Sequence, residues 1–374
     1  MDSALVPSRT QLPLVTPVEV SPIRYLVLWP TAACDLDCVY CYRRDRRGGR
    51  MALETAERAV QTVLDDAQAS GAPFHIQLAG GEPLLVPDVI DRVVDLVCSA
   101  GYSPKTIAVQ TNATRIDANM AAQLHAWGIQ VGVSLDGPPS VQDTTRGNAK
   151  ATFGGLIHLA AFDVPVRITS VVSSINAHRL DELVVTAASF GNITGIALDL
   201  IIPLGSAATR PDLIPSARAI RCGIFEMYSA LMALNRERRQ PLIWRELETV
   251  RLALRKPLRL PSDHDSHIQP TPVSRYCFAV TGQCMAVSPN GAVYPCSQAV
   301  GDPTRQAGTI EAIDREALKQ FNRVPPLSGP CTQCALAGRC PGDCPSRLDV
   351  TSPDNQHPLM CVIYNTLAQL EGAE

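Results

Sequence analysis

The chain has 374 residues, 46% of them hydrophobic, which is enough to bury the core of one large α/β domain and a smaller one. A net charge of −3 and a sequence pI near 6.2 exclude the strongly basic surface of proteins that bind nucleic acid nonspecifically. No segment reaches the apolar length that a membrane-spanning helix needs. The sequence therefore predicts neither a nucleic-acid partner nor a membrane partner.

The N-terminal segment, residues 1–22, is expected to be an extended tail. It contains Pro7, Pro13 and Pro17 and lacks the basic start and the continuous apolar run of a secretory signal, so we expect a cytoplasmic protein. The cytoplasm keeps thiols reduced, so the 13 cysteines are expected to bind metal rather than to form disulfides.

Short apolar segments alternate with amphipathic helical segments from residue 23 to residue 234. The predicted strands are Tyr25–Trp29, His75–Ala79, Thr106–Val109, Ile129–Ser134, Val166–Val172 and Gly195–Leu200. Between them, segments such as Glu54–Ser70 and Pro87–Ala100 carry apolar residues at helical spacing. This alternation predicts a parallel sheet of six βα units, which is an α/β fold of the partial (β/α)6 TIM-barrel type.

The composition changes after the last predicted βα unit. Residues 235–272 are charged and end in a proline-marked break, which predicts a bridging helical linker. Residues 273–374 are rich in cysteine, proline and glycine and lack regular periodicity. We therefore expect a second, irregular C-terminal domain that metal clusters rather than a large apolar core hold together.

Three cysteines, Cys34, Cys38 and Cys41, directly follow the first predicted strand. A CxxxCxxC loop can bind three corners of a 4Fe-4S cube and leave the fourth iron without a protein ligand. The loop would lie at the carboxyl end of a strand, where the active sites of α/β barrels are found. The alternative is a structural zinc loop, which would need a fourth ligand nearby.

A second motif, Gly80-Gly81-Glu82-Pro83, follows the second predicted strand and precedes a helix. Its glycines would let the backbone approach a ligand closely and leave amide donors unobstructed. The carboxylate of Glu82 could accept a hydrogen bond from an ammonium group. The alternative is a plain turn.

The two motifs, together with the aromatic Tyr40 before the third cysteine, resemble the signature of the radical S-adenosylmethionine (SAM) enzymes. The resemblance implies that SAM chelates the open iron and that its reductive cleavage gives a 5′-deoxyadenosyl radical, which abstracts hydrogen. It also implies an external reductant of the flavodoxin or ferredoxin type. Tyr40 and residues 80–83 would belong to the SAM site, with Gly80 to Pro83 holding the amino group of SAM.

The resemblance adds four cofactor contacts after the third and fourth strands: Asn112, Ser134, Asp136 and Arg146. In related peptide-modifying enzymes, the residues that match Ser134 and Arg146 contact the ribose and the carboxylate of SAM. Gln142 stands where those relatives often have histidine, which puts that contact in doubt. Asp136 and Asp143 could instead be helix-capping or turn residues.

Eight cysteines lie in the C-terminal hundred residues: Cys277, Cys284, Cys296, Cys331, Cys334, Cys340, Cys344 and Cys361. Their spacing resembles the SPASM domain, a C-terminal module of radical SAM enzymes that holds two auxiliary 4Fe-4S clusters. The resemblance implies a first set of Cys277, Cys284, Cys296 and Cys344, and a second set of Cys331, Cys334, Cys340 and Cys361. The chain would then bind three 4Fe-4S clusters, although a zinc ribbon also suits part of the pattern.

Two cysteines and a basic loop lie outside these motifs. Cys98 and Cys222 fall in predicted helices, and we expect both to pack in the core as small hydrophobic residues. Cys222 is also a candidate hydrogen-atom donor to a substrate radical. The five arginines between Arg43 and Arg50 predict a solvated loop, with the grip of an acidic peptide as the alternative.

SPASM-bearing radical SAM enzymes mostly act on peptides or proteins, so the resemblance implies a maturase of ribosomally made peptides. Its substrate would be a precursor peptide that receives a crosslink, loses a fragment, or is modified in its backbone or side chains. Sulfatase-maturing enzymes have a catalytic aspartate where this chain has Ser297, which counts against that activity. Only 33 residues precede Cys34, so a separate leader-binding protein or the barrel itself would capture the peptide.

Three alternatives to peptide maturation remain open at the level of sequence. A radical dehydrogenase or epimerase of a small molecule uses the same core, and a sulfatase-maturing enzyme shares both domains. The non-enzymatic alternative is an iron-sulfur scaffold or electron carrier. The sequence does not identify the catalytic acid or base.

Overall fold

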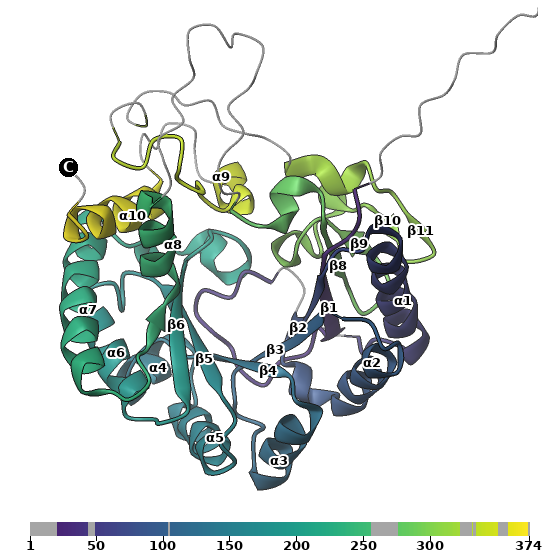
Figure 1. The fold of residues 1–374 in the computed structure, drawn as a ribbon, viewed down its shortest axis with the longest axis horizontal. Helices are drawn as coiled ribbons and strands as arrows, with labels where there is room; N and C mark the ends of the chain where they lie inside the picture. The colour runs from purple at the N-terminus through teal and green to yellow at the C-terminus, as the bar shows by residue number, and fades with distance from the viewer. Residues whose placement is uncertain are drawn as a thin grey trace, which may run out of the picture.

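The computed structural model describes residues 21–43, 49–103, 105–255, 276–321, 331, 334–350 and 358–372. Within these residues nine strands form one sheet in the order β7-β6-β5-β4-β3-β2-β1-β8-β9 (Figure 1). Every neighbouring pair is parallel except β8 and β9. The strands are β1 (Tyr25–Thr31), β2 (Phe74–Gly80), β3 (Lys105–Thr111), β4 (Gln130–Ser134), β5 (Val166–Val172), β6 (Ile193–Leu200), β7 (Ile243–Trp244), β8 (Cys284–Val287) and β9 (Val293–Tyr294).

The six predicted strands are β1 to β6, and the prediction of an open, partial α/β barrel is confirmed. The sequence missed the three strands at the two ends of the sheet. Strand β7 has two residues in a charged segment, and β8 and β9 lie among cysteines and turns, so none carries a readable period. The sheet thus continues into the predicted linker at one end and into the predicted C-terminal domain at the other.

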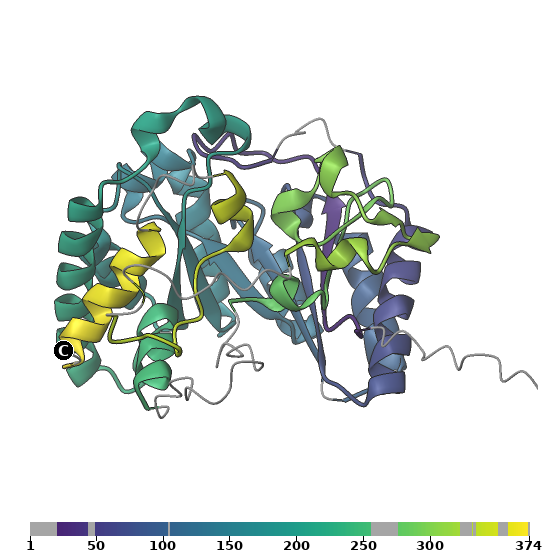
Figure 2. The ribbon, with the colours of Figure 1, turned by 90° about the horizontal axis from the view of Figure 1, so that it is seen from above.

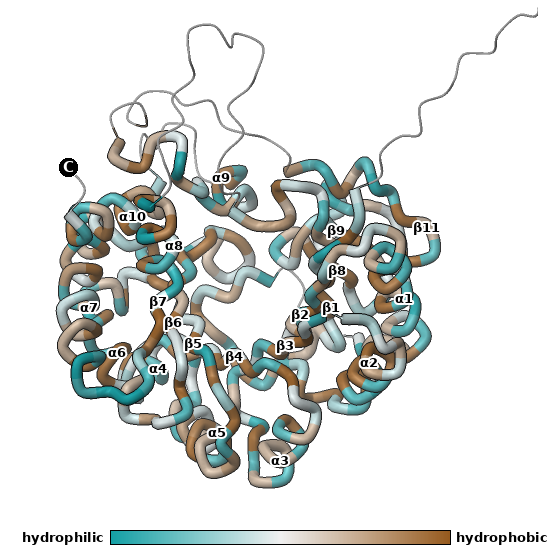
Figure 3. The backbone as a smooth tube through the Cα atoms, in the orientation of Figure 1, coloured by the Kyte–Doolittle hydropathy of each residue, from teal (hydrophilic) through white to brown (hydrophobic). Residues whose placement is uncertain are grey.

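Helices cover the outer, convex side of the sheet (Figure 1). They are α1 (Leu53–Ser70), α2 (Pro87–Ser99), α3 (Ala118–Trp127), α4 (Pro139–Thr145), α5 (Ala149–Ala161), α6 (Leu180–Ala188), α7 (Ala217–Glu237) and α8 (Arg245–Arg255). Two further helices, α9 (Pro345–Val350) and α10 (Leu359–Leu370), belong to the C-terminal region. Around the ring, hydrophobic and hydrophilic stretches alternate along the helices (Figure 3), as expected when one face of each packs on the sheet. No helix in the described ranges is long and apolar enough to cross a membrane.

The inner, concave face of the sheet is covered at β1 and open farther along. Val27 and Trp29 are buried there in a second apolar cluster with residues of the C-terminal region, such as Tyr294. On the neighbouring strand β2 the inward His75 and Gln77 stay half-exposed. The barrel interior beyond β1 is therefore accessible and lined by polar side chains.

The C-terminal region spans the opening of the barrel and contacts both of its ends (Figures 1 and 2). At one end β8 pairs with β1, so that Tyr25 lies beside Cys284. At the other end α10 packs against α7 and α8. There the carboxylate of Glu371 accepts hydrogen bonds from Arg251 Nε (2.8 Å) and from the hydroxyl of Tyr228 (2.9 Å).

Candidate active site

One cavity lies at the carboxyl ends of the central strands, and most of the predicted cofactor residues line it. They are Cys34, Cys38, Tyr40, Cys41, Gly80, Gly81, Glu82, Asn112, Ser134 and Arg146. Two other predicted residues, Pro83 and Asp136, are buried and are not among the lining residues. The cysteine loop, the glycine motif and the predicted contacts after β3 and β4, which lie far apart in the chain, thus meet around one space.

Main-chain hydrogen bonds hold the cysteine loop in place. The amide of Cys41 donates to the carbonyl of Cys38 (3.1 Å), which closes a turn between these two cysteines. The amide of Val39 donates to the carbonyl of Thr145 at the end of α4 (2.9 Å). The thiols of this fixed loop border the cavity, and burial raises the pKa of Cys38 to about 11.

Arg43 corrects the expectation that the whole arginine-rich segment is solvated. Its side chain is buried, and it donates hydrogen bonds to the carbonyl of Ala32 and, through Nε, to the sulfur of Cys41 (3.2 Å). Arg43 therefore ties the end of the cysteine loop to the residue that follows β1. Arg50 is exposed and pairs with Asp88 of α2, and residues 44–48 of the segment lie outside the described residues.

Asp35, inside the cysteine loop, ties the loop to the end of β3. Its Oδ1 accepts from the side-chain amide of Asn112 (2.8 Å), and its Oδ2 accepts from Thr114 Oγ1 and Arg115 Nε, both at 2.7 Å. The same Asn112 amide lies 3.9 Å from the sulfur of Cys34. Asn112, which was predicted to contact the cofactor, therefore also positions the cysteine loop.

The two glycines of the second motif lie close to the first strand and to the residues just before the cysteine loop: Gly80 against Trp29 and Thr31, and Gly81 against Ala33. The amide of Gly81 donates to the carbonyl of Thr31 (3.0 Å), and the amide of Glu82 donates to that of Ala33 (2.8 Å). A Cβ atom at Gly81 would lie 1.8 Å from the carbonyl oxygen of Ala33. The expectation of unobstructed amide donors is therefore wrong for Gly81, because the hydrogen bond to Thr31 uses its amide.

Gly81→Ala is expected to displace the cysteine loop, because backbone atoms on both sides of the contact have little room to move. We expect a loss of 5′-deoxyadenosine formation of about 10-fold to 100-fold, the range seen when groups that orient metal ligands are removed. Anaerobic turnover of SAM with dithionite measures it. Gly154→Ala on α5 is the control, because a Cβ there meets nothing within 4 Å; equal activity of the two variants would contradict the expectation.

Glu82 is almost fully buried, and three hydrogen bonds fix its carboxylate. Oε1 accepts from Thr111 Oγ1 (2.7 Å) and from the amide of Leu84 (3.1 Å), and Oε2 accepts from the amide of Asn112 (2.8 Å). Burial raises the pKa of this carboxyl to about 7, although these hydrogen bonds oppose the shift. The carboxylate is thus held rigidly at the cavity wall and can accept one more donor.

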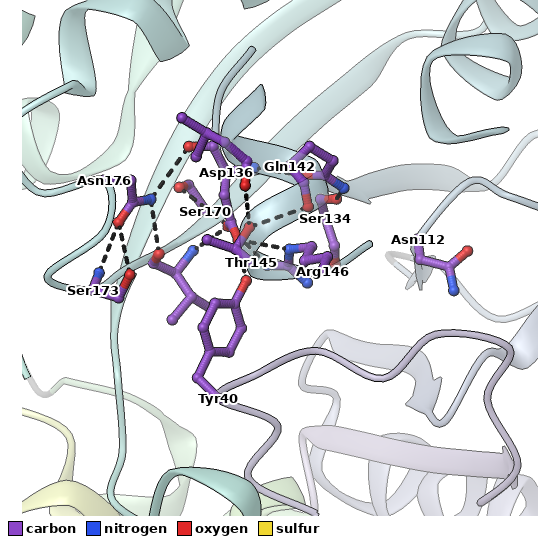
Figure 4. Close-up of polar contacts among 12 residues, drawn as sticks. Tyr40, Asn112, Ser134, Asp136, Gln142, Thr145, Arg146, Ser170, Ser173 and Asn176 are labelled. Atoms are coloured by element: carbon purple, nitrogen blue, oxygen red, sulfur yellow. Dashed lines mark hydrogen bonds and ion pairs between the residues drawn. The ribbon is translucent and has the colours of Figure 1, made fainter. Parts of the chain in front are cut away.

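A buried network around Asp136 positions Arg146 (Figure 4). Arg146 donates through Nε and Nη2 to the two carboxylate oxygens of Asp136, at 3.0 and 3.1 Å, and its guanidinium lies 5.4 Å from the ring centre of Tyr40. The hydroxyl of Tyr40 also donates to Asp136. Asp136 therefore holds Tyr40 and Arg146, which both line the cavity, while Asp136 itself is buried and does not line it.

The polar residues beside this network have structural partners. Gln142 is fully buried, and its Oε1 accepts from the amide of Asp136 (3.0 Å), so the glutamine braces the end of β4. Asp143 accepts from the amide of Ala149 at the start of α5 (2.7 Å), as a capping residue does. Ser134 accepts from Gln110 Nε2 (2.9 Å) and keeps its own hydroxyl hydrogen available to the cavity.

The structure brings together the members of the first predicted C-terminal cysteine set. Burial raises the pKa of Cys284, and negative charge on the neighbouring Cys296 and Cys277 raises it further. Burial also raises the pKa of Cys344 to about 12, and the same two neighbours contribute. The thiol of Cys344 donates to Gln298 Oε1 (3.1 Å), and Gln298 lines the cavity, so this set lies directly behind one cavity wall.

In the second predicted set, Cys334 and Cys340 both pack against the main apolar core. Burial raises the pKa of Cys361 to about 12, and charge on Cys340, Cys331 and Cys334 adds to the shift. In the described part of the chain, no three His, Cys, Asp or Glu side chains converge as they would around a single metal ion. The donors in both sets are cysteine thiols, whose thiolates are the ligands of 4Fe-4S cubes.

The two remaining cysteines are not core residues, so that expectation was wrong. Cys98 on α2 and Cys222 on α7 are both exposed, because each lies one position beyond the buried stripe of its helix. Cys222 is also not among the residues that line the cavity. A sequence reading missed Asp199 at the end of β6, an accessible carboxylate of the cavity wall that pairs with Arg245 (2.9 Å).

Comparisons with known proteins agree with this geometry. The radical SAM superfamily matches residues 30–184. The uncharacterized protein MJ0907 of Methanocaldococcus jannaschii is 30% identical over 286 residues, which cover 74% of this chain and 86% of that protein. The AdoMet-dependent heme synthase of Methanosarcina barkeri is 25% identical (85% and 90% covered), and the mycofactocin maturase MftC of Mycobacterium ulcerans is 25% identical (84% and 80% covered).

Two solved structures share the fold. The first, anSMEcpe with bound AdoMet, has a TM-score of 0.71 at 19% identity and covers 92% of this chain and 96% of its own. The second, Streptococcus suis SuiB bound to the precursor peptide SuiA, has a TM-score of 0.64 at 17% identity and covers 89% and 74%. The chain belongs to the radical SAM superfamily. It is therefore a radical SAM enzyme, whose family cofactors are SAM and a 4Fe-4S cluster.

Proposed function

We propose that this enzyme is a maturase that modifies a ribosomally made precursor peptide. The observation that carries the proposal is the cavity in which the cysteine loop, Glu82 and Arg146 meet beside an open, polar barrel interior. The names of MftC and of SuiB with its precursor peptide support a peptide substrate. The accessible interior beyond β1 gives an extended substrate room to reach the cavity.

Each proposed cofactor residue has a defined task. Cys34, Cys38 and Cys41 would hold the SAM-binding cluster, and Arg43 would hold the end of their loop through its hydrogen bond to the sulfur of Cys41. Glu82 would accept from the amino group of SAM, and Ser134 would donate to its ribose. When bound, cluster and SAM supply the 5′-deoxyadenosyl radical that abstracts hydrogen from the substrate.

Arg146 would attract the carboxylate of SAM, and Asp136 and Tyr40 would hold the Arg146 side chain in its orientation. A guanidinium that is paired on one edge by Asp136 keeps further N–H donors for a second anion. Asn112 would keep the cysteine loop in register with β3. The two C-terminal sets would hold auxiliary 4Fe-4S clusters in a domain that covers residues 273–374, and an external reductant of the flavodoxin or ferredoxin type would supply electrons.

The proposal is tested by co-expression with short peptides that are encoded beside the gene. We expect a mass change in one peptide that needs both SAM and reductant, and equimolar 5′-deoxyadenosine. Oxidation or epimerisation of a small molecule instead would favour the alternative of a small-molecule dehydrogenase or epimerase. The similarity to a heme synthase, whose name indicates a small-molecule product, is the reason to test this alternative. SAM cleavage without any peptide change, across all neighbouring peptides, would count against peptide maturation.

SAM binding is expected to weaken below pH 7. The folded-state pKa of Glu82 is about 7, above its unfolded value, so the carboxyl gains a proton as the pH falls through 7 and loses its attraction for an ammonium group. Affinity should then fall by up to about 10-fold per pH unit. Anaerobic calorimetry at pH 6 and pH 8 measures this, and Glu82→Gln should bind weakly with no pH dependence in this range.

A further inference from the structure

The cysteine loop and the first C-terminal cysteine set are joined by a short hydrogen-bonded contact, here named the Trp29–Ser297–Tyr42 bridge. Trp29 Nε1 donates to Ser297 Oγ at 2.9 Å, and the hydroxyl of Tyr42 lies 3.0 Å from the same oxygen. Tyr42 and Ser297 are 255 positions apart in the chain. The contact therefore connects the barrel with the C-terminal region.

The positions of the two hydroxyl residues are informative. Tyr42 directly follows Cys41, the last cysteine of the loop, and Ser297 directly follows Cys296 of the first C-terminal set. The route from one thiol to the other thus consists of two neighbouring residues and one hydrogen bond. The next residue, Gln298, lines the cavity and accepts from the thiol of Cys344 in the same set.

Apolar side chains surround the Trp29–Ser297–Tyr42 bridge. Trp29 is buried, and it packs in one cluster with Cys284 and Tyr294, against which Tyr42 and Cys296 are half-buried. Removing the hydrogen-bond partner of a hydroxyl group that is surrounded by apolar side chains destabilises the folded protein, because water does not fully replace the lost partner. The oxygen of Ser297 satisfies the indole of Trp29 and the phenol of Tyr42 together.

We propose that Tyr42 and Ser297 are positioning residues that hold the segment of Cys41 against the segment of Cys296. Through them, the position of the cysteine loop depends on the first C-terminal set. The inference rests on the proposed function, because that function assigns a cluster to each segment. The hydroxyl of Ser297 is engaged with both Trp29 and Tyr42 in this contact.

The test uses full-length protein that is reconstituted anaerobically with iron and sulfide. Ser297→Ala and Tyr42→Phe remove the contact from its two sides, and Ser297→Thr restores a hydroxyl. Tyr102→Phe is the control, because its hydroxyl donates to the carbonyls of Ala67 and Ala72 away from the cavity. Amide hydrogen exchange of residues 38–43 should be about fivefold faster in Ser297→Ala, as expected for the loss of one net hydrogen bond.

A spectroscopic readout separates positioning from simple stabilisation. In the dithionite-reduced protein, the EPR signal that changes on addition of SAM should shift in Ser297→Ala and in Tyr42→Phe, and should be restored in Ser297→Thr. A folded Ser297→Ala or Tyr42→Phe protein with wild-type exchange and an unshifted signal would overturn the proposal. Neither measurement needs a peptide, so a failure of peptide maturation alone would leave a shifted signal in place and count only against the proposed function.

Discussion

Replacing Cys38 with alanine is expected to abolish the formation of 5′-deoxyadenosine. A 4Fe-4S cube that keeps one iron open for SAM has only three protein ligands, so the loss of one thiolate leaves two. Removal of groups that merely orient metal ligands costs about 10-fold to 100-fold, so loss of a ligand should cost at least about 100-fold. Iron should fall by about four atoms from about twelve per chain. Anaerobic SAM turnover and iron analysis measure both effects.

Cys98→Ala supplies the matched control for this experiment. Cys98 is exposed on α2 and has no place in the cavity, so its removal should change neither iron content nor SAM cleavage. A Cys38→Ala protein that retained both the iron and the activity of wild type would show that the loop does not bind the SAM cluster.

Asp136→Asn is expected to lower the free energy of unfolding by about 3–5 kcal/mol, the cost of leaving a buried charge without its partner. Asp136 is fully buried and Arg146 is only 9% exposed. Burial disfavours the charged guanidinium, but Asp136 together with Tyr40 and Cys38 outweighs this and raises the pKa of Arg146 above its ordinary value. In the variant, Arg146 stays charged and loses its compensating carboxylate. Urea unfolding monitored by circular dichroism measures the change.

The exposed pair of Arg210 and Asp212, at 2.7 Å, provides the contrast. Both side chains are open to solvent, so Asp212→Asn should leave the urea midpoint unchanged within error. The double variant Asp136→Leu with Arg146→Met removes both buried charges and should recover most of the lost stability, although SAM binding would still be weak. An Asp136→Asn protein as stable as wild type would show that the pair is not what holds Arg146.

The sequence predicted the barrel well because its signals are local and repeated. Each of β1 to β6 contains a short apolar or alternating segment, and helices with one apolar face lie between these segments, so the existence and type of the elements could be predicted directly. The cysteine spacings and the glycine pair were enough to predict where the site lies, because their chemistry depends on residue type and on separation along the chain. The placement of Val166–Val172 agrees with β5 at both ends.

What could not be predicted depends on contacts between distant segments. Nothing near Arg43 distinguishes it from the other arginines of its segment, yet only the fold shows it against Cys41. The glycines at 80 and 81 were correctly singled out for close approach, but only the fold shows that the backbone they approach is that of Thr31 and Ala33. Cys98 and Cys222 each lie one position away from a buried residue of their helix, and this single position leaves both side chains exposed to solvent.

The pairing of β1 with β8 has a consequence for the synthesis of the protein. One edge of β1 pairs with β2, which is synthesised soon after β1. The other edge pairs with residues 284–287 of β8, which are synthesised much later. During most of translation a buried, apolar strand therefore presents an unpaired edge, which is a template for aggregation. Nascent chains that stall before residue 284 should depend strongly on chaperones, and the last part of the chain completes the first strand.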